Sequence, residues 1–111
     1  AAPHRQRRPV TPAPVAVTCW GELPAERPLP GVLRVLVGGQ HAGAAERAGG
    51  TAVAHWSTAG SRDRRTEHAS AEDAVTAVIR SGFARRLGAR AASRVRWSDR
   101  ALHAAHTPFR A

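Results

Sequence analysis

The stretch Val32-Leu-Arg-Val-Leu-Val37 is the most apolar run of this chain, and it is closed by Gly31 on one side and by Gly38-Gly39 on the other. Six residues between glycines are too few for a stable helix and are typical of a strand buried in a sheet. We therefore expect residues 32–37 to form the centre of the sheet.

The segments on either side of this run predict further strands. Residues 15–19 alternate between larger and smaller side chains, which suits a short strand, and Gly21-Glu22-Leu23-Pro24 ends it. Residues 51–58 alternate in the same way, and the polar residues 62–68 are typical of an exposed edge strand that closes a hairpin with them. The glycine- and alanine-rich stretch 38–50 shows no clear period, so we expect a long loop there.

Residues 70–88 carry the clearest helical pattern. Ser70 suits an N-cap, and the two acids that follow it lie near the positive end of the helix dipole. Apolar side chains recur at three- and four-residue spacing and predict one buried stripe: Val75, Val78, Ile79, Phe83 and Leu87. Gly88 is placed to end the helix in a left-handed conformation. Beyond it, residues 94–97 suit either a strand or a helical extension, and we favour the extension.

These elements predict a small α/β (α+β) fold, with an antiparallel or mixed sheet of three to four strands packed by one main C-terminal amphipathic helix. Residues 1–14 hold four prolines and three arginines, with little to bury, and predict a disordered basic arm. Residues 15–111 then form a single small domain with a basic C-terminal extension. Much of the 42% hydrophobic content is alanine, which indicates a modest core.

Arginine crowds toward the C-terminal end of the chain. Eight of the 17 basic residues lie in the last 32 residues, where Asp99 is the only acid, and the formal net charge is +9 with no lysine. A very GC-rich genome explains the absence of lysine but not this crowding. Guanidinium groups bind phosphate oxygens at two points and stack on bases, so we expect a nucleic-acid partner. The predicted RNA contacts are Arg62, Arg64, Arg65, Arg80, Arg85, Arg86, Arg90, Arg94, Arg96 and Arg100, with Arg5, Arg7 and Arg8 of the arm.

Other kinds of site lack their residues. Cys19 is the single cysteine and has no partner for an internal disulfide, and no apolar stretch reaches the roughly 18 residues that a membrane span needs. His103-Ala-Ala-His106 has a spacing that suits a metal, but no second ligand pair accompanies it. We expect no catalytic residue, metal, cofactor, small-molecule substrate or membrane partner. The expected location is the cytoplasm or, alternatively, a mitochondrial or plastid matrix.

One alternative is an enzyme-like fold. The order of the strands 32–37 and 51–58, the polar strand, the helix and a strand near residue 97 resembles the ribonuclease H fold, which puts Glu72 and Asp99 where that family has its second and third metal-binding acids. The first of these strands ends in Val37-Gly38-Gly39, which supplies no carboxylate, so two-metal hydrolysis would lose its bridging ligand. This alternative is therefore a catalytically impaired domain, and we expect the protein not to be an enzyme.

From about residue 15 to residue 97 the chain also resembles the N-terminal domain of the hibernation-promoting factor and ribosome-associated inhibitor family. The matching features are the strand closed by Gly21-Glu22-Leu23-Pro24, the strand Leu33-Arg34-Val35-Leu36-Val37, Glu46-Arg47 before a second strand, the Gly60 turn into a basic strand, the helix from Ala71 to Leu87, and Trp97. The resemblance implies a β-α-β-β-β-α domain that grips ribosomal RNA in the mRNA and tRNA channel of the small subunit. The segment between Pro24 and Val32 is too short for that family's first helix.

The expected function is therefore that of a ribosome-associated, rRNA-binding protein of the hibernation type. Its partners would be ribosomal RNA and the ribosome, the small subunit in preference to the large one. The alternative is a structural ribosomal protein of an organelle or a bacterium, since a basic arm on a small alanine-rich body suits a chain that threads between rRNA helices.

Overall fold

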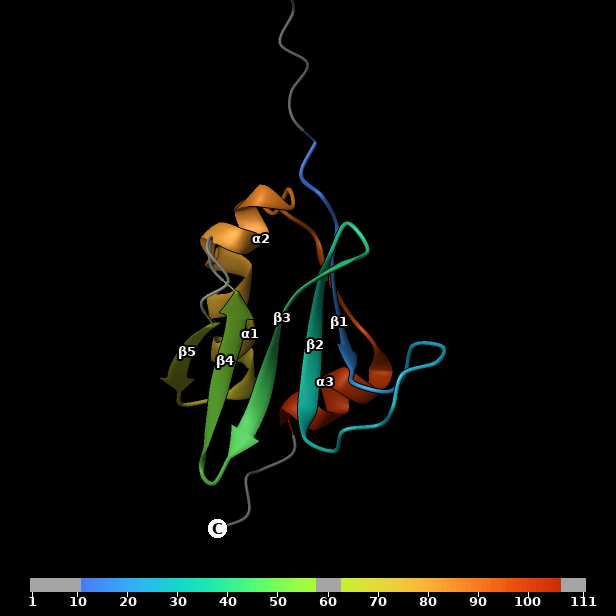
Figure 1. Cartoon of the computed structure of the whole chain (residues 1–111), viewed down its shortest axis with the longest axis vertical. Coiled ribbons are helices and arrows are strands. Elements are labelled where there is room, and N and C mark those ends of the chain that lie inside the picture. Colours follow the sequence, from blue (N-terminus) through green and yellow to red (C-terminus); the bar gives the residue numbers. More distant parts are fainter. Residues whose placement is uncertain (1–10, 58–62, 107–111) are drawn as a thin grey trace, which may run out of the picture.

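The computed structural model describes residues 11–57 and 63–106 (Figure 1). The turn expected between residues 58 and 62, and most of the expected arm, lie outside these ranges. The described elements follow the chain in this order: β1 (Val15–Cys19), β2 (Val32–Val37), β3 (Gln40–Ala48), β4 (Thr51–Ser57), β5 (Asp63–His68), α1 (Ala71–Arg80), α2 (Gly82–Arg86), β6 (Val95–Trp97) and α3 (Asp99–His106).

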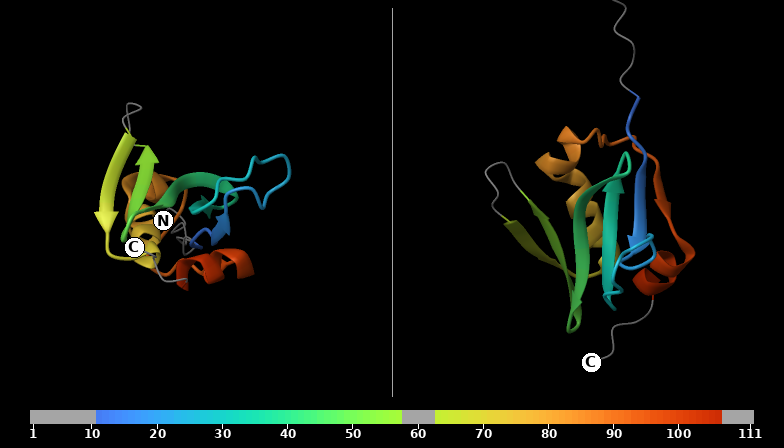
Figure 2. Two further views of the ribbon diagram at one scale, coloured as in Figure 1. Left: turned by 90° about the horizontal axis from the view of Figure 1, so that it is seen from below. Right: turned by 45° about the vertical axis from the view of Figure 1, so that its right-hand side comes forward.

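The described strands form one six-stranded sheet in the order β5-β4-β3-β2-β1-β6. Every neighbouring pair is antiparallel except β1 and β6, which run parallel. The helices lie on one face of this sheet (Figure 2), where α1 packs against β3 and β4 and α3 packs against β1. The α+β class is confirmed. The sheet, however, has six strands and not the three to four that we expected. Three helices, and not one main helix, are found among the described residues.

The strand β3 occupies the stretch that was predicted to be a loop, and glycine pairs at its two ends explain why. Gly38 and Gly39 have φ of 57° and 82°, which only glycine adopts readily in succession, and they form the two-residue hairpin turn between β2 and β3. Gly49-Gly50 makes the corresponding turn between β3 and β4. The sequence signal was therefore present as two Gly-Gly pairs one strand apart, and the alanines between them hid it.

Small residues in β3 allow α1 to lie close to the sheet. A Cβ atom at Gly43 would lie 2.4 Å from the carbonyl oxygen of His55 and 2.6 Å from Cγ1 of Val78, so only glycine fits. Ala45 and Ala54 are paired across β3 and β4 and are both buried beneath the same helix. The alanine content that looked like a weak core is thus a packing requirement of the helix.

Valines form most of the remaining core. Val15 and Val17 of β1 pair with Val37 and Val35 of β2, and all four are at most 1% exposed. The largest side chains that are fully buried in the described residues are all valines. The expectation of a modest core is confirmed, and residues 32–37 do lie in the interior of the sheet.

The helix predicted over residues 70–88 is divided by Ser81. Ser70 caps α1 as expected, since its Oγ accepts a hydrogen bond from the backbone N–H of Asp73 at 3.1 Å. Ser81 then adopts an extended conformation that ends α1, and its Oγ accepts from the N–H of Ala84 at 3.1 Å and so caps α2. Because this break resets the helical phase, Phe83 is only half-buried and is not among the side chains that pack on the core. The predicted stripe is wrong at that position.

The residues after Gly88 form β6 and α3. The helical extension that we favoured over residues 94–97 is wrong, and the strand alternative is confirmed, because β6 pairs with the open edge of β1. The helices α1 and α2 provide the long crossover that a late parallel strand requires. The resulting order of elements has no helix between β1 and β2, and so it differs from the β-α-β-β-β-α order that the ribosomal resemblance implies.

The fold begins slightly before β1. The N–H of Ala13 donates to the carbonyl of Gly88 at 3.0 Å, and the carbonyl of Pro14 accepts from the N–H of Gly38 at 2.9 Å. Both residues were assigned to the arm, but these bonds tie them to the fold. The described chain therefore starts at the end of the molecule where α2 lies (Figure 1).

Candidate nucleic-acid interface

The end of α2 is a tightly bonded turn that carries several arginines. Gly88 has a φ of 111° and ends the helix as predicted, and its N–H donates to the carbonyl of Arg85 at 3.0 Å. Arg90 folds back on this turn, because its Nη1 donates to the carbonyls of Arg85 at 2.9 Å and Ala89 at 2.8 Å. A cation at the negative end of a helix is favourable. These two hydrogen bonds therefore fix the position of the Arg90 guanidinium group.

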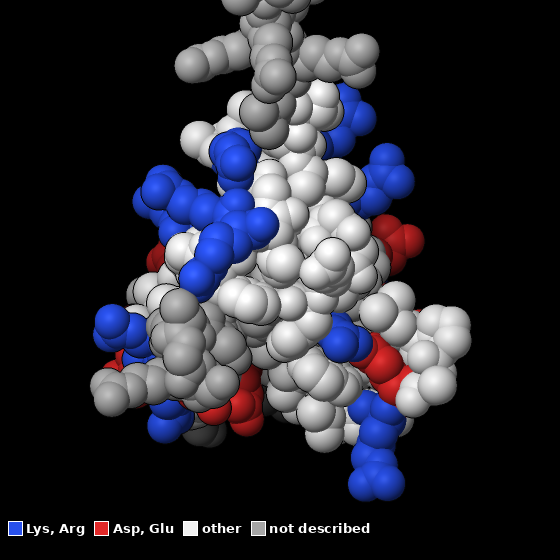
Figure 3. All heavy atoms as spheres, turned by 45° about the horizontal axis from the view of Figure 1, so that its top comes forward, with Lys and Arg blue, Asp and Glu red and all other residues white. Residues whose placement is uncertain are grey.

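Four exposed arginines lie around this turn: Arg80, Arg85, Arg86 and Arg90. We call them the arginine cluster. Arg85, Arg86 and Arg90 line one shallow hollow, and Arg80 joins Arg85 and Arg90 along a second one. Basic side chains gather over this end of the molecule in the space-filling view (Figure 3). Within the described residues, none of the four forms an ion pair with a carboxylate.

Among the described residues, most of the other predicted contacts lie away from the arginine cluster. Arg64 and Arg65 lie on the edge strand β5, and strand alternation points them to opposite faces of the sheet. Arg96 lies on the edge strand β6. Arg94 comes just before that strand, between Ser93 and Val95, which line a hollow with three arginines of the cluster. Arg100 is on α3, at the end of the molecule opposite α2 (Figure 1). The remaining predicted contacts, Arg5, Arg7, Arg8 and Arg62, lie outside the described residues.

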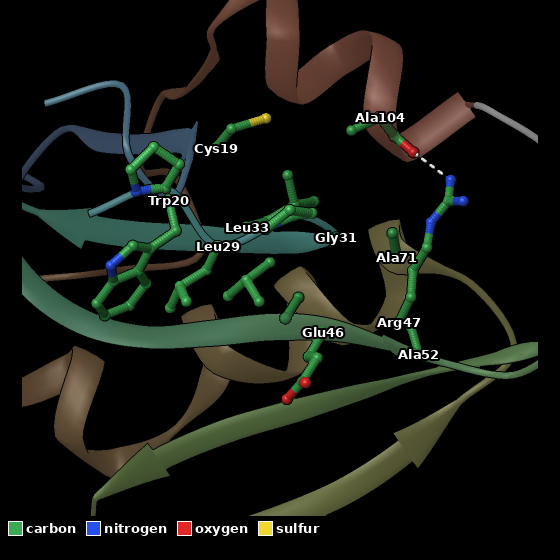
Figure 4. A pocket seen from close by; sticks show the side chains of 14 residues that line it. Cys19, Trp20, Leu29, Gly31, Leu33, Glu46, Arg47, Ala52, Ala71 and Ala104 are labelled. Carbon is green, nitrogen blue, oxygen red and sulfur yellow. Dashed lines mark hydrogen bonds between the residues drawn. The ribbon is translucent and has the colours of Figure 1, made fainter. Parts of the chain in front are cut away.

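A small apolar cavity of about 160 Å³ lies at the α3 end of the fold (Figure 4). Leu29 and Leu33 form part of its wall, and Cys19 contributes its side chain from β1. Arg47 at the rim donates from Nη2 to the carbonyl of Ala104 at 2.7 Å, which fixes β3 to the last turn of α3. Burial raises the pKa of the Cys19 thiol, Glu22 raises it further, and Arg100 opposes both. A neutral thiol in an apolar wall is a weak nucleophile.

The loop between β1 and β2 is held against the sheet by an aromatic and ionic contact. The Arg34 guanidinium lies 4.6 Å from the centre of the Trp20 ring and forms an ion pair with Glu26. Its Nε also donates to Nδ1 of His41 at 3.2 Å, and His41 meets Trp20 edge to face. Partial burial lowers the pKa of His41, and the adjacent Arg34 charge lowers it further. Arg34 is therefore engaged within the fold and is not available to a phosphate.

The acids of the ribonuclease H alternative are kept apart. Glu72 forms an ion pair with Nε2 of His106 at 2.5 Å, at the last residue of α3, whereas Asp99 lies in the first turn of that helix. Seven residues of helix place them on the order of 10 Å apart. Strand β6 also pairs with β1 and not with residues 32–37, because β2 already has neighbours on both sides. Across residues 11–57 and 63–106, no three His, Cys, Asp or Glu side chains gather where they would hold a metal ion.

Reasoning from the sequence missed four residues beside the arginine cluster. Thr76, Ile79, Ser93 and Val95 line the same hollow as Arg80, Arg85 and Arg90. Ile79 was assigned to the buried stripe, and Val95 to a helical extension. No local signal joins them, because the residues of α1 and β6 meet only after the chain has crossed the sheet.

Among the described residues, no helix combines the length and the apolar character needed to cross a bilayer. Comparison with protein-family models, with curated protein sequences and with solved structures gives no match to this chain.

Proposed function

We propose that this protein binds RNA through the arginine cluster, and that the RNA is ribosomal. The observation that carries the proposal is the gathering of Arg80, Arg85, Arg86 and Arg90 around one helix end without a carboxylate partner in the described residues. Guanidinium groups that lie this close together repel one another, and each of them binds phosphate oxygens well. A polyanion therefore supplies the missing counter-charge.

The N-terminal residues support the same surface. Thr11 is the first described residue, and Ala13 is bonded to Gly88 beside the arginine cluster. In the sequence, Arg5, Arg7 and Arg8 come shortly before Thr11. We propose that their charges add to those that a phosphate backbone meets.

The salt dependence of RNA affinity tests the proposal. An Arg80→Ala, Arg85→Ala, Arg86→Ala variant removes three charges and spares Arg90, which bonds to the helix end. Its slope of log affinity against log salt should be shallower than that of the unchanged protein by roughly two to three.

An Arg27→Ala, Arg64→Ala, Arg65→Ala variant is the matched control. It removes the same net charge from exposed positions elsewhere, and it should keep most of the slope. Equal losses in the two variants would mean that net charge alone drives binding, and the arginine cluster would then have no special role.

Ribosome sedimentation tests the identity of the RNA and separates the two kinds of ribosomal protein. A constitutive component stays on the subunit through a high-salt wash in one copy per particle. A hibernation-type factor binds in less than one copy and leaves when translation resumes. A chain that binds RNA but remains at the top of the gradient would exclude the ribosome while leaving RNA binding intact.

A further inference from the structure

Two neighbouring hollows, one of them beside the arginine cluster, share part of their walls. The first has a volume of about 340 Å³ and contains Thr76, Ile79 and Val95 together with three of the arginines. The second has a volume of about 270 Å³ and shares those same three residues. Because α1 supplies two of the shared residues and β6 supplies the third, we call the two hollows together the α1–β6 groove.

The groove changes character along its length. Arg80, Arg85 and Arg90 stand at the end near α2. The middle is apolar, and Trp97 and Leu102 continue it toward α3. Glu72 lies at the far end. A ligand that fits this groove has a negative charge at the arginine end and a flat or apolar group in the middle. It has no negative charge at the end where Glu72 lies.

Exposed apolar surface in the groove points to an occupant. Val95 is 39% exposed and Leu102 is 44% exposed, and they are two of the three large hydrophobic side chains that are exposed among the described residues. The volume of the larger hollow lies within the range of small-ligand pockets. The hydroxyls of Thr76 and Ser93 add hydrogen-bonding groups to its walls.

We propose that the α1–β6 groove binds an unpaired nucleotide of the RNA target. Its base would lie on Ile79 and Val95, and its phosphate would meet the arginines at the groove's end. The inference rests on the proposed function and deepens it, because it selects RNA with bulged or looped nucleotides over uninterrupted duplex. Bases inside an A-form duplex are stacked and hide their faces, whereas an unpaired base can enter a pocket.

Two RNA duplexes with the same number of phosphates test this inference, one fully paired and the other with a bulge. The unchanged protein should bind the bulged RNA about tenfold more tightly, as expected when one base buries roughly 60 Å² of apolar surface against aliphatic side chains. A 2-aminopurine in the bulge should change its fluorescence on binding, because that probe reports the surroundings of the base and not the charge of the backbone.

Thr76→Glu places an acid in the middle of the groove, at an exposed position of α1 that tolerates glutamate. This variant should lower the preference for the bulged RNA to about one, judged by the ratio of the two affinities. Thr66→Glu on β5 is the matched control, with the same change of residue and charge away from the groove, and it should keep the preference. Circular dichroism melting checks that both variants fold.

The outcomes separate the groove from the proposed function. Equal binding of the two RNAs by the unchanged protein overturns the groove inference and leaves RNA binding by the arginine cluster in place. Failure to bind either RNA overturns both. Displacement of the groove's occupant by an acidic, leucine-containing peptide, together with no effect of Thr76→Glu on RNA, would assign the groove to a protein partner and overturn the inference as well.

Discussion

Gly43→Ala should destabilise the protein strongly, although it adds only one methyl group to a strand. The added Cβ would lie 2.4 Å from the His55 carbonyl oxygen and 2.6 Å from Cγ1 of Val78. Ordinary contacts begin at 3.4 Å, so α1 and β4 would each have to move by roughly 1 Å. The carbonyl belongs to a strand that is paired on both sides, and it cannot turn away as a side-chain tip can.

The expected loss of unfolding free energy is about 3 kcal/mol, at the upper end of the usual range for overpacking, because backbone is involved. For a domain of this size that loss lowers Tm by roughly 10–20 °C. Urea unfolding followed by tryptophan fluorescence measures it, and Trp56 on β4 lies beside the added methyl group. Gly50→Ala is the matched control, since Gly50 faces open space, and its effect should stay within about 0.5 kcal/mol.

A double-mutant cycle with Val78→Ala tests the named contact. Val78 is fully buried, so its truncation alone should cost roughly 2 kcal/mol. It also removes one of the two atoms that the Gly43→Ala methyl meets, so the double variant should cost less than the sum of the single ones by at least about 0.5 kcal/mol. A Gly43→Ala variant as stable as the unchanged protein, or costs that simply add, would refute the close approach of α1 to β3.

Three further predictions follow from the titrating and acidic side chains. The pKa of His41 is lowered from its ordinary value of 6.5 in the folded state, so on acidification the unfolded chain takes up its proton first. The free energy of unfolding should therefore fall as the pH drops below about 6.5. Urea titration at several pH values should show a smaller fall for His41→Gln. Cys19 should react with iodoacetamide at pH 8 more slowly than a cysteine in an unfolded peptide, because burial raises its pKa, and a rate equal to the peptide's would contradict the buried geometry. Incubation of RNA or an RNA–DNA hybrid with Mg²⁺ or Mn²⁺ should give no cleavage; cleavage that disappears in a Glu72→Gln, Asp99→Asn variant would favour the ribonuclease H-like alternative.

Elements with a strong local period were predicted well. The apolar run of β2, the alternation of β1 and β4, and the Ser70 cap of α1 depend on neighbours within a few residues, and these features were all found. The strand β3 was missed because its alanines and glycine carry little hydrophobic period. Their small size is set by α1, which lies across them and comes later in the chain.

The candidate interface was predicted only in part. The crowding of arginine toward the C-terminus is a property of the sequence, but Arg96 and Arg100 lie outside the cluster because β6 and α3 carry them away from α2. Arg34 and Arg47 are likewise bound within the fold, one beside Trp20 and the other at the carbonyl of Ala104. Charge in a sequence says how much basic surface exists, whereas contacts determine which part of it is free.

By itself the sequence determined the class of fold, the basic character of the chain and the two outer ends of the helical segment, at Ser70 and Gly88, because these depend on composition and on contacts between near neighbours. Tertiary structure decided the sixth strand and the α1–β6 groove. Each of these requires residues distant in sequence to meet: β6 pairs with β1 from the other end of the domain, and Val95 reaches Ile79 only after that pairing. Such contacts are selected by the packing of whole elements, and no local pattern records them.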